Sequence, residues 1–165
     1  MTEHRAAPVD SDVDRHLPAP PRQRNWDPAV LAAVAAGGVL GAEARYGLSV
    51  LRPHEPGQWP MATLLINVSG CFLIGILMFA ITNLTSPHRL VRPFLGVGVL
   101  GGYTTFSTAM VDVQQMVLAG RGGAALGYLL ATLVGAVAAA FAGVTFTRAA
   151  AAMWVGRRAR RGEAA

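Results

Sequence analysis

The 165-residue chain contains no lysine and a single cysteine, Cys71, and only 14% of its residues are charged, against about 25% in a typical soluble domain. One cysteine excludes an intramolecular disulfide and a cysteine-rich metal site. Acidic residues are scarce in the middle of the chain, where Glu43, Glu55 and Asp112 are the whole set between residues 28 and 148. No nucleophile with its base, metal cluster or phosphate loop is recognisable either, so the sequence predicts that the protein is not an enzyme.

Long apolar stretches make up most of the chain. Hydrophobic residues account for 53% of it, and four apolar stretches follow Pro28, at roughly 29–51, 59–82, 93–119 and 123–147. Each is long enough to cross the hydrocarbon core of a bilayer, which needs about 20 helical residues. The connections between them are short, which favours antiparallel neighbours. The predicted fold is an all-α integral membrane protein with four transmembrane helices.

The two ends of the chain differ from this middle part. Residues 1–27 are rich in Pro, Asp and Arg and have no apolar period, so we expect a disordered tail outside the membrane. Residues 28–148 form the expected transmembrane domain, and residues 149–165 form a basic C-terminal tail. Of the 14 arginines, 11 fall on the side of both termini, which predicts cytoplasmic termini and contact with anionic lipid. The arginines punctuate apolar runs instead of gathering with aromatics on one face, so nucleic-acid binding is not expected.

Polar residues inside the apolar stretches are the informative ones, because each must find a partner in protein or along a water-lined path. Thr63 and Asn67 are four residues apart in the second stretch, and Tyr128 and Thr132 repeat that spacing in the fourth. Each pair therefore lies on one helical face. Such pairs could line a narrow path for a strongly hydrated anion, or they could simply join helices by hydrogen bonds.

The third stretch contains the run Gly-Gly-Tyr-Thr-Thr-Phe-Ser-Thr at residues 101–108. Two glycines followed by four hydroxyl residues around one aromatic predict a helix that is broken near the middle of the membrane. A break frees carbonyl oxygens that suit a small cation, and the next half-helix begins with amide groups of positive character. Alternatively, the glycines allow another helix to cross closely, while Thr and Ser bond to carbonyls one turn earlier.

Three motifs together resemble the CrcB/Fluc family of fluoride channels. Residues 37–46 resemble the family's GGxxGAxxRY opening, residues 63–72 its TLxxNxxGSF segment, and residues 101–108 its GGxTTFST break. The resemblance extends from about residue 29 to residue 148 and leaves the two tails without a counterpart.

The resemblance implies a fluoride-specific channel in the bacterial plasma membrane, the cell inner membrane, which confers fluoride resistance by passive export from the cytoplasm. It implies two four-helix subunits in opposite orientations with a structural Na⁺ at the centre of their interface. By matching motif positions, the carbonyl oxygens of Gly101 and Thr104 would bind Na⁺, and the ring edge of Phe106 would face fluoride. Arg45 would lie in a basic vestibule. The polar lining of the path would comprise Thr63, Asn67, Ser107, Thr108, Tyr128 and Thr132.

Departures from the family pattern bear on how the chain assembles. Ala109 stands where the family has a second phenylalanine, Asp112 where it has glutamate, and Cys71 where it has serine. One fluoride path could therefore be incomplete. The arginine bias predicts insertion in one direction, and hence pairing with an oppositely oriented paralogue in place of a homodimer. Two other readings stay open: a small proton-coupled exporter that uses Glu43, and a non-conducting partner subunit of a heteromeric channel.

Overall fold

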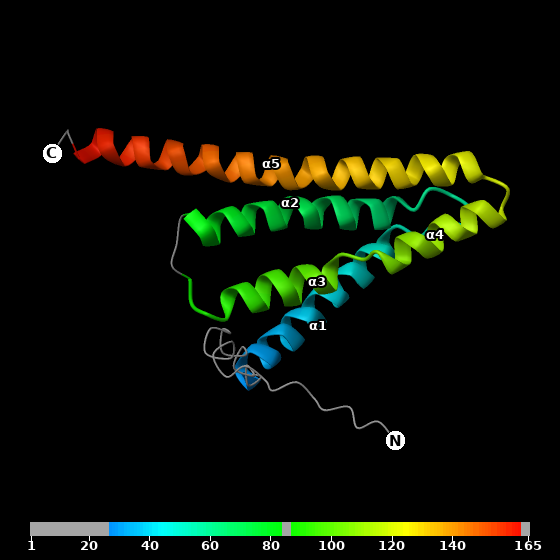
Figure 1. Ribbon diagram of the computed structural model, residues 1–165, viewed down its shortest axis with the longest axis horizontal. Helices are drawn as coiled ribbons and strands as arrows, with labels where there is room; N and C mark the ends of the chain where they lie inside the picture. The colour runs from blue at the N-terminus through cyan, green and yellow to red at the C-terminus, as the bar shows by residue number, and fades with distance from the viewer. Residues whose placement is uncertain (1–26, 84–86, 163–165) are drawn as a thin grey trace, which may run out of the picture.

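The computed structural model of the protein describes residues 27–83 and 87–162, so nearly all of the predicted N-terminal tail lies outside it. Four helical segments in this part of the chain are long and apolar enough to cross a membrane, as the sequence predicts. The third is built from three successive pieces. The elements are α1 (Pro28–Leu51), α2 (Met61–Asn83), the π-helical η1 (Arg92–Val99), α3 (Leu100–Tyr103), α4 (Ser107–Leu118) and α5 (Gly122–Gly162). Figure 1 shows the break between α3 and α4.

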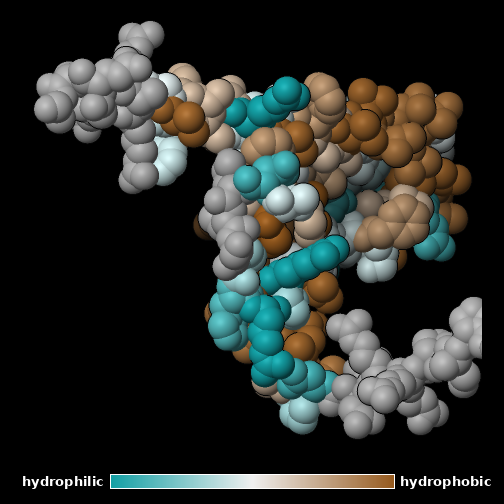
Figure 2. Space-filling view, turned by 60° about the vertical axis from the view of Figure 1, so that its left-hand side comes forward, coloured by the Kyte–Doolittle hydropathy of each residue, from teal (hydrophilic) through white to brown (hydrophobic). Residues whose placement is uncertain are grey.

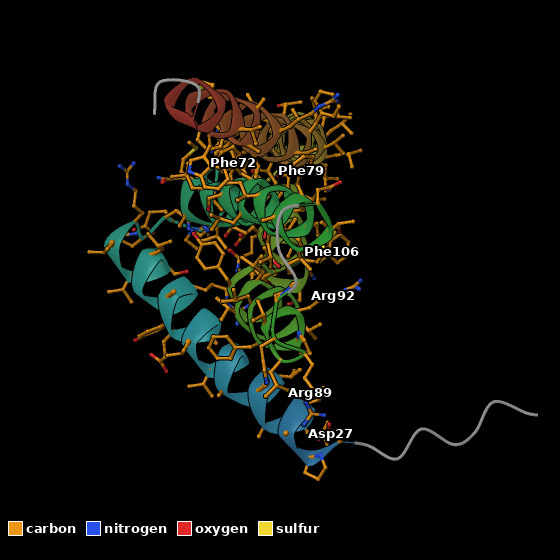
Figure 3. The ribbon with its side chains drawn as sticks, turned by 90° about the vertical axis from the view of Figure 1, so that its left-hand side faces the viewer. Asp27, Phe72, Phe79, Arg89, Arg92 and Phe106 are labelled. Carbon is orange, nitrogen blue, oxygen red and sulfur yellow. The ribbon has the colours of Figure 1, made fainter. Side chains whose placement is uncertain are left out.

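The start of α1 is set by Asp27 and Pro28. The Asp27 carboxylate accepts a hydrogen bond of 3.0 Å from the Ala29 amide, which satisfies one of the free amides of the first turn, and proline is well suited to the first helical position. Arg89, in the connection between α2 and η1, forms an ion pair with the same carboxylate (Figure 3). This pair joins the beginning of the first span to the beginning of the third.

Close helix packing depends on a few glycines. α2 runs beside α5, and α1 crosses η1 and α3 obliquely (Figure 1). At Gly41, a Cβ atom would collide with the carbonyl oxygen of Val99, and at Gly102 one would collide with the carbonyl oxygen of Gly38. Here the backbones of two helices are in direct contact, which is the usual way for helices to associate where lipid offers no hydrophobic driving force. Hydrophobic residues cover much of the remaining surface (Figure 2), as lipid contact requires.

The last helix is longer than the sequence pattern indicates. α5 continues through Thr147, the expected end of the fourth span, as far as Gly162, and it projects past the end of α2 (Figure 1). Its continuation begins with Arg148 and four alanines, which favour a helix and offer no capping residue or proline to stop it. Most of the predicted basic tail is therefore helical, up to Gly162.

Candidate functional site

The third span is interrupted between Tyr103 and Ser107, which confirms the predicted break. The interruption lies after the two glycines and not at them. α3 includes Gly101 and Gly102, and the backbone becomes extended at Thr104, with φ −75° and ψ 157°. Gly102 instead provides the close approach to α1. The run therefore contains both the predicted break and the predicted close crossing, at different residues: Gly102 permits the crossing, and the helix is interrupted at residues 104–106.

Asn67 of α2 braces the break. Its side-chain amide donates a hydrogen bond of 2.8 Å to the Thr105 carbonyl oxygen, and its Oδ1 accepts one of 2.8 Å from the Thr105 amide. The side chain thus replaces the two backbone partners that Thr105 would have in a continuous helix. Thr105 is 7% exposed, so without Asn67 both groups would be buried and unpaired. The sequence predicts that Asn67 lines an ion path, and the structure shows that its side chain also holds the break in place.

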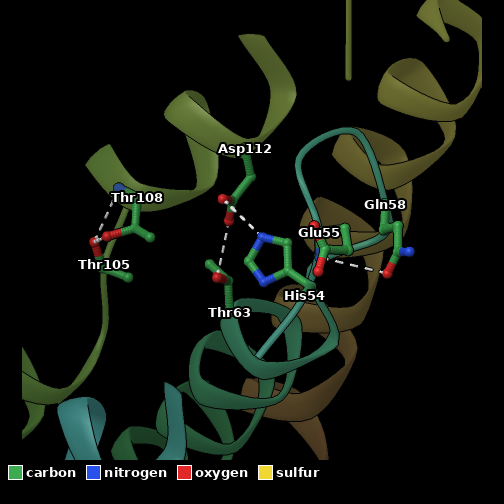
Figure 4. A network of polar contacts seen from close by, with 7 residues as sticks. All are labelled: His54, Glu55, Gln58, Thr63, Thr105, Thr108 and Asp112. Atoms are coloured by element: carbon green, nitrogen blue, oxygen red, sulfur yellow. Dashed lines mark hydrogen bonds and ion pairs between the residues drawn. The ribbon is translucent and has the colours of Figure 1, made fainter. Parts of the chain in front are cut away.

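Thr105 itself caps the next half-helix. Its hydroxyl oxygen accepts a hydrogen bond of 3.2 Å from the Thr108 amide, donates one of 3.0 Å to the Thr108 hydroxyl, and lies 3.4 Å from the Ser107 hydroxyl. These contacts hold the first turn of α4 (Figure 4). Ser107 and Thr108 therefore present their hydroxyls at the α4 N-terminus, where amide groups favour negative charge.

The break leaves the carbonyl oxygens of Gly101 and Thr104 without their helical partners. In a continuous helix they would accept hydrogen bonds from the amides of Thr105 and Thr108. These two amides instead donate to the Asn67 side chain and to the Thr105 hydroxyl. Gly101 and Thr104 also line a shallow depression of about 160 Å³ on the surface of the chain. The carbonyl oxygens at the two positions predicted to bind a cation are therefore not engaged in helical hydrogen bonds.

A second, larger groove of about 490 Å³ opens beside the break. Phe106 lies at its edge immediately before α4, with 78% of its surface exposed (Figure 3). Asn67 and Thr104 line the groove from one side and Tyr128 and Thr132 from another, so it collects predicted site residues from distant parts of the chain. Most of the remaining lining is apolar.

Ala109 also lines this groove and is 2% exposed, in a cluster with Met116, Ala125 and Tyr128. Its methyl group packs inside the chain where the family pattern has an aromatic ring. Phe106 is therefore the single phenylalanine that lines the groove, among the residues that the structure describes.

A polar cluster lies about one helical turn from the groove residues Asn67 and Ala109, near the α1–α2 connection. The Thr63 hydroxyl donates a hydrogen bond of 2.9 Å to one oxygen of the Asp112 carboxylate, and His54 Nε2 lies 3.2 Å from the other (Figure 4). The buried hydroxyls of Tyr128 and Thr132 make no hydrogen bond of ordinary geometry within the described part of the chain, but the Tyr128 hydroxyl lies close to the hydroxyls of Thr132 and Thr63. The Tyr128 and Thr132 hydroxyls line the groove and can donate to each other, to water or to a ligand there.

Arg45 and Glu43 lie away from these grooves, on α1. Arg45 is partly exposed one turn beyond Gly41, and its carbonyl oxygen accepts a hydrogen bond from Ser49. Glu43 is exposed and lines neither groove. The vestibule role of Arg45 and the alternative role of Glu43 as a proton carrier both stay predictions.

Sequence reasoning missed two residues of the site and gave little weight to a third. Thr105 was counted only as one of four hydroxyls, yet it organises the break. His54 stands in a Pro-rich connection 58 residues before its partner Asp112, and no local pattern signals that contact. Asp112 stands out in the sequence only because the family has glutamate at that position.

Comparison with known proteins shows which family the sequence matches. The family model described as CrcB-like protein, Camphor Resistance (CrcB), matches residues 32–144. A Nocardia farcinica protein named fluoride-specific ion channel FluC 2 is 45% identical over 88% of this chain and 100% of its own length. A Thermobifida fusca protein of the same name is 53% identical over 72% of this chain and 89% of its own length. Streptomyces avermitilis has two similar proteins. Its FluC 2 is 51% identical over 70% of this chain and 75% of its own length. Its FluC 3 is 43% identical over 82% of this chain and 66% of its own length.

Proposed function

The chain belongs to the CrcB family of fluoride channels, and from that premise we propose that it is one subunit of a fluoride-specific ion channel that lets fluoride leave the cytoplasm passively. The observation that carries the proposal is the groove beside the break. It joins the exposed ring of Phe106 to the buried hydroxyls of Tyr128 and Thr132. Phe106 comes from the third span, and Tyr128 and Thr132 lie one turn apart on α5, so the groove brings together groups from two spans.

An anion that sheds water in a membrane needs donors to replace its hydration shell. In this proposal the hydroxyls of Tyr128 and Thr132 donate to fluoride at one end of the groove. The ring edge of Phe106, which is the electropositive part of the aromatic quadrupole, faces it at the break. Ser107 and Thr108 add hydroxyls at the positive end of α4. The apolar remainder of the lining limits water, so these few donors must replace the hydration shell of the anion, and selectivity rests on their placement and on the width of the path.

A structural Na⁺ is part of the proposal, and the freed oxygens at the break fit it. Carbonyl oxygens are ligands of the kind that hard cations prefer, and those of Gly101 and Thr104 lack helical partners. A bound Na⁺ would supply positive charge between the carbonyl ends of two facing half-helices. Asn67 and Thr105 contribute by holding the break open, since their side chains occupy the amides that would otherwise close the helix.

The proposed channel contains two subunits of opposite orientation. In one chain the groove is open on one side, and the Phe106 ring is mostly exposed, so a second subunit is needed to enclose a path. The partner is a second copy or, as the arginine bias favours, an oppositely oriented paralogue with this chain's termini in the cytoplasm. The two FluC proteins of Streptomyces avermitilis support the paralogue, because one organism carries several such chains.

Growth on fluoride tests the proposal in cells. A bacterial strain without its own fluoride channel should regain growth on fluoride when it expresses this chain with its paralogue, and should lose that growth with Phe106→Ile. Phe141→Ile is the matched control, because Phe141 is similarly exposed on α5 but lines neither groove. Equal growth of the two variants at equal membrane abundance would contradict the role of Phe106, and failure of the wild-type pair to restore growth would contradict the channel itself.

A further inference from the structure

The last helix extends beyond its neighbour at one end of the bundle. α2 and α5 run in the same direction (Figure 1), and Gly143 of α5 packs against the backbone of α2 at Phe72 and Ile76. Each residue of α2 is therefore level with a residue of α5 about 70 positions later in the chain. Asn83 ends α2, so that end is level with the turn of α5 that contains Trp154. The rest of α5 projects about 12 Å beyond it.

The sequence of this extension changes from apolar to basic within two turns. Met153, Trp154 and Val155 are apolar, yet each is 56–60% exposed. Tryptophan is enriched where a transmembrane helix passes from hydrocarbon to headgroups, so Trp154 marks that boundary. The sequence then places arginine at positions 157, 158, 160 and 161 of the same helix. Positions 157, 158 and 161 follow Trp154 by three, four and seven residues, which puts them on its side of the helix.

The height of these four positions above the boundary matches the layer of lipid headgroups. They lie three to seven residues past Trp154, which is about 5–10 Å for a helix along the membrane normal. The headgroup layer is about 5–8 Å thick on each side of the hydrocarbon core. Electrostatic attraction to it decays over about 8 Å at physiological salt. All four arginines are thus within reach of lipid phosphates, with which a guanidinium group forms paired hydrogen bonds.

Other charges at this end of the bundle do not neutralise the extension. Arg92, which begins the third span, is exposed at the same end (Figure 3). Asp27 is the one acidic residue at this end within the described part of the chain, and it is paired with Arg89. Residues 148–165 contain five arginines and a single acidic residue, Glu163. The charge of this end is therefore positive and complements an anionic surface.

We propose that the continuation of α5, residues 148–162, binds the phosphate headgroups of anionic phospholipid in the leaflet that this end of the bundle faces. The proposal does not depend on which ion the protein conducts. Net charge distinguishes the ligand, because phosphatidylglycerol carries a negative charge and phosphatidylcholine carries none. Arginines beside a span also direct its insertion, but that role ends once the chain is in the membrane. Headgroup binding requires the same charges in the folded protein, where they can be tested.

Lipid binding by the purified protein in a neutral detergent tests the proposal. Bound lipid is counted by native mass spectrometry during titration with phosphatidylglycerol, or with phosphatidylcholine of the same acyl chains. One basic residue near a membrane surface contributes roughly fivefold in affinity for anionic lipid. Joint replacement of the arginines at 157, 158, 160 and 161 by glutamine should therefore weaken phosphatidylglycerol binding by at least about tenfold. Phosphatidylcholine binding should not change.

Two further comparisons isolate charge and place. Joint replacement of the same four arginines by lysine keeps the charge and should retain most of the preference for phosphatidylglycerol. Glutamine and lysine both favour helices, so neither set of changes should unfold the extension. Arg158→Gln alone should weaken phosphatidylglycerol binding roughly fivefold. Arg52→Gln is its matched control, because Arg52 is exposed at the opposite end of the bundle, and it should bind as the wild type does.

Several results would overturn the proposal. One is equal affinity of the wild type for the two lipids, and another is an unchanged preference after the four glutamine replacements. Equal losses in Arg52→Gln and Arg158→Gln would show that positive charge anywhere on the protein suffices. Equal losses in the lysine and glutamine sets would show that charge is not what binds. Tighter binding of a single-stranded oligonucleotide than of phosphatidylglycerol would assign the arginines to nucleic acid instead. Elution of each variant at the wild-type volume in size-exclusion chromatography establishes that it is folded.

Discussion

Replacement of Asn67 by alanine should destabilise the protein far more than an ordinary polar substitution. Asn67 makes two hydrogen bonds of 2.8 Å with the backbone of Thr105, at a position that is 7% exposed. Removal of the side chain leaves a buried amide and a buried carbonyl oxygen unpaired, at a cost of about 1–3 kcal/mol each. We therefore expect the free energy of unfolding to fall by about 2–6 kcal/mol. The same change should abolish fluoride efflux, because the break loses its geometry.

The assay is reversible unfolding in mixed detergent micelles, with Asn83→Ala as the control. Asn83 is exposed at the end of α2, where its side chain bonds to the Phe79 carbonyl oxygen. Its loss should cost under about 0.5 kcal/mol. Asn67→Asp keeps an acceptor for the Thr105 amide but places a second acceptor oxygen against the Thr105 carbonyl oxygen at a buried site, so it too should destabilise the protein more than Asn83→Ala. An Asn67→Ala protein as stable as Asn83→Ala would refute the bracing role.

Three further predictions concern helix contact, the polar cluster and the first helix cap. Gly41→Ala should strongly lower the melting temperature in detergent, because the added Cβ would collide with the Val99 carbonyl oxygen. Gly38→Ala is the control and should be neutral or slightly stabilising, because its Cβ would have open space. Equal effects of the two changes would contradict the close crossing of α1 and the third span. Thr63→Val should cost about 1–3 kcal/mol of unfolding free energy, because the Asp112 carboxylate loses a buried donor, and an unchanged unfolding curve would contradict that contact. Hydrogen bonding to the Ala29 amide, with help from Arg89, lowers the pKa of Asp27 below its ordinary value of 3.8, so the stability it provides is present above that value and is lost as pH falls through the lowered pKa. The melting temperature should therefore drop more steeply below pH 4 in the wild type than in Asp27→Asn, and parallel profiles would contradict this.

The membrane spans could be predicted because apolar run length follows directly from bilayer thickness. The break could also be predicted, since a Gly-Gly pair before four hydroxyl residues weakens a helix and offers local hydrogen bonds. Its exact position could not, because it depends on Asn67, which lies 38 residues away and supplies the partners of Thr105. The length of α5 was underestimated because hydropathy ends at Arg148 while helix propensity does not.

The candidate site was predictable only in part, for a related reason. Helical spacing of four grouped Thr63 with Asn67 and Tyr128 with Thr132, and α2 and α5 do pack together. Spacing cannot show which polar groups find partners within the chain. The structure gives Thr63 a partner in Asp112 and leaves the hydroxyls of Tyr128 and Thr132 without a hydrogen bond of ordinary geometry within the described residues. His54 escaped notice because its contact depends on how a Pro-rich connection folds over α4, which no periodicity encodes.

The most direct test of the channel proposal is anion efflux from liposomes that contain the purified protein with its partner, recorded with fluoride and chloride electrodes in the absence of a pH gradient. The proposal predicts rapid fluoride efflux, no chloride efflux, and loss of the fluoride signal with Phe106→Ile but not with Phe141→Ile. Efflux of both anions, or fluoride efflux that survives Phe106→Ile, would contradict a fluoride path at the break of the third span.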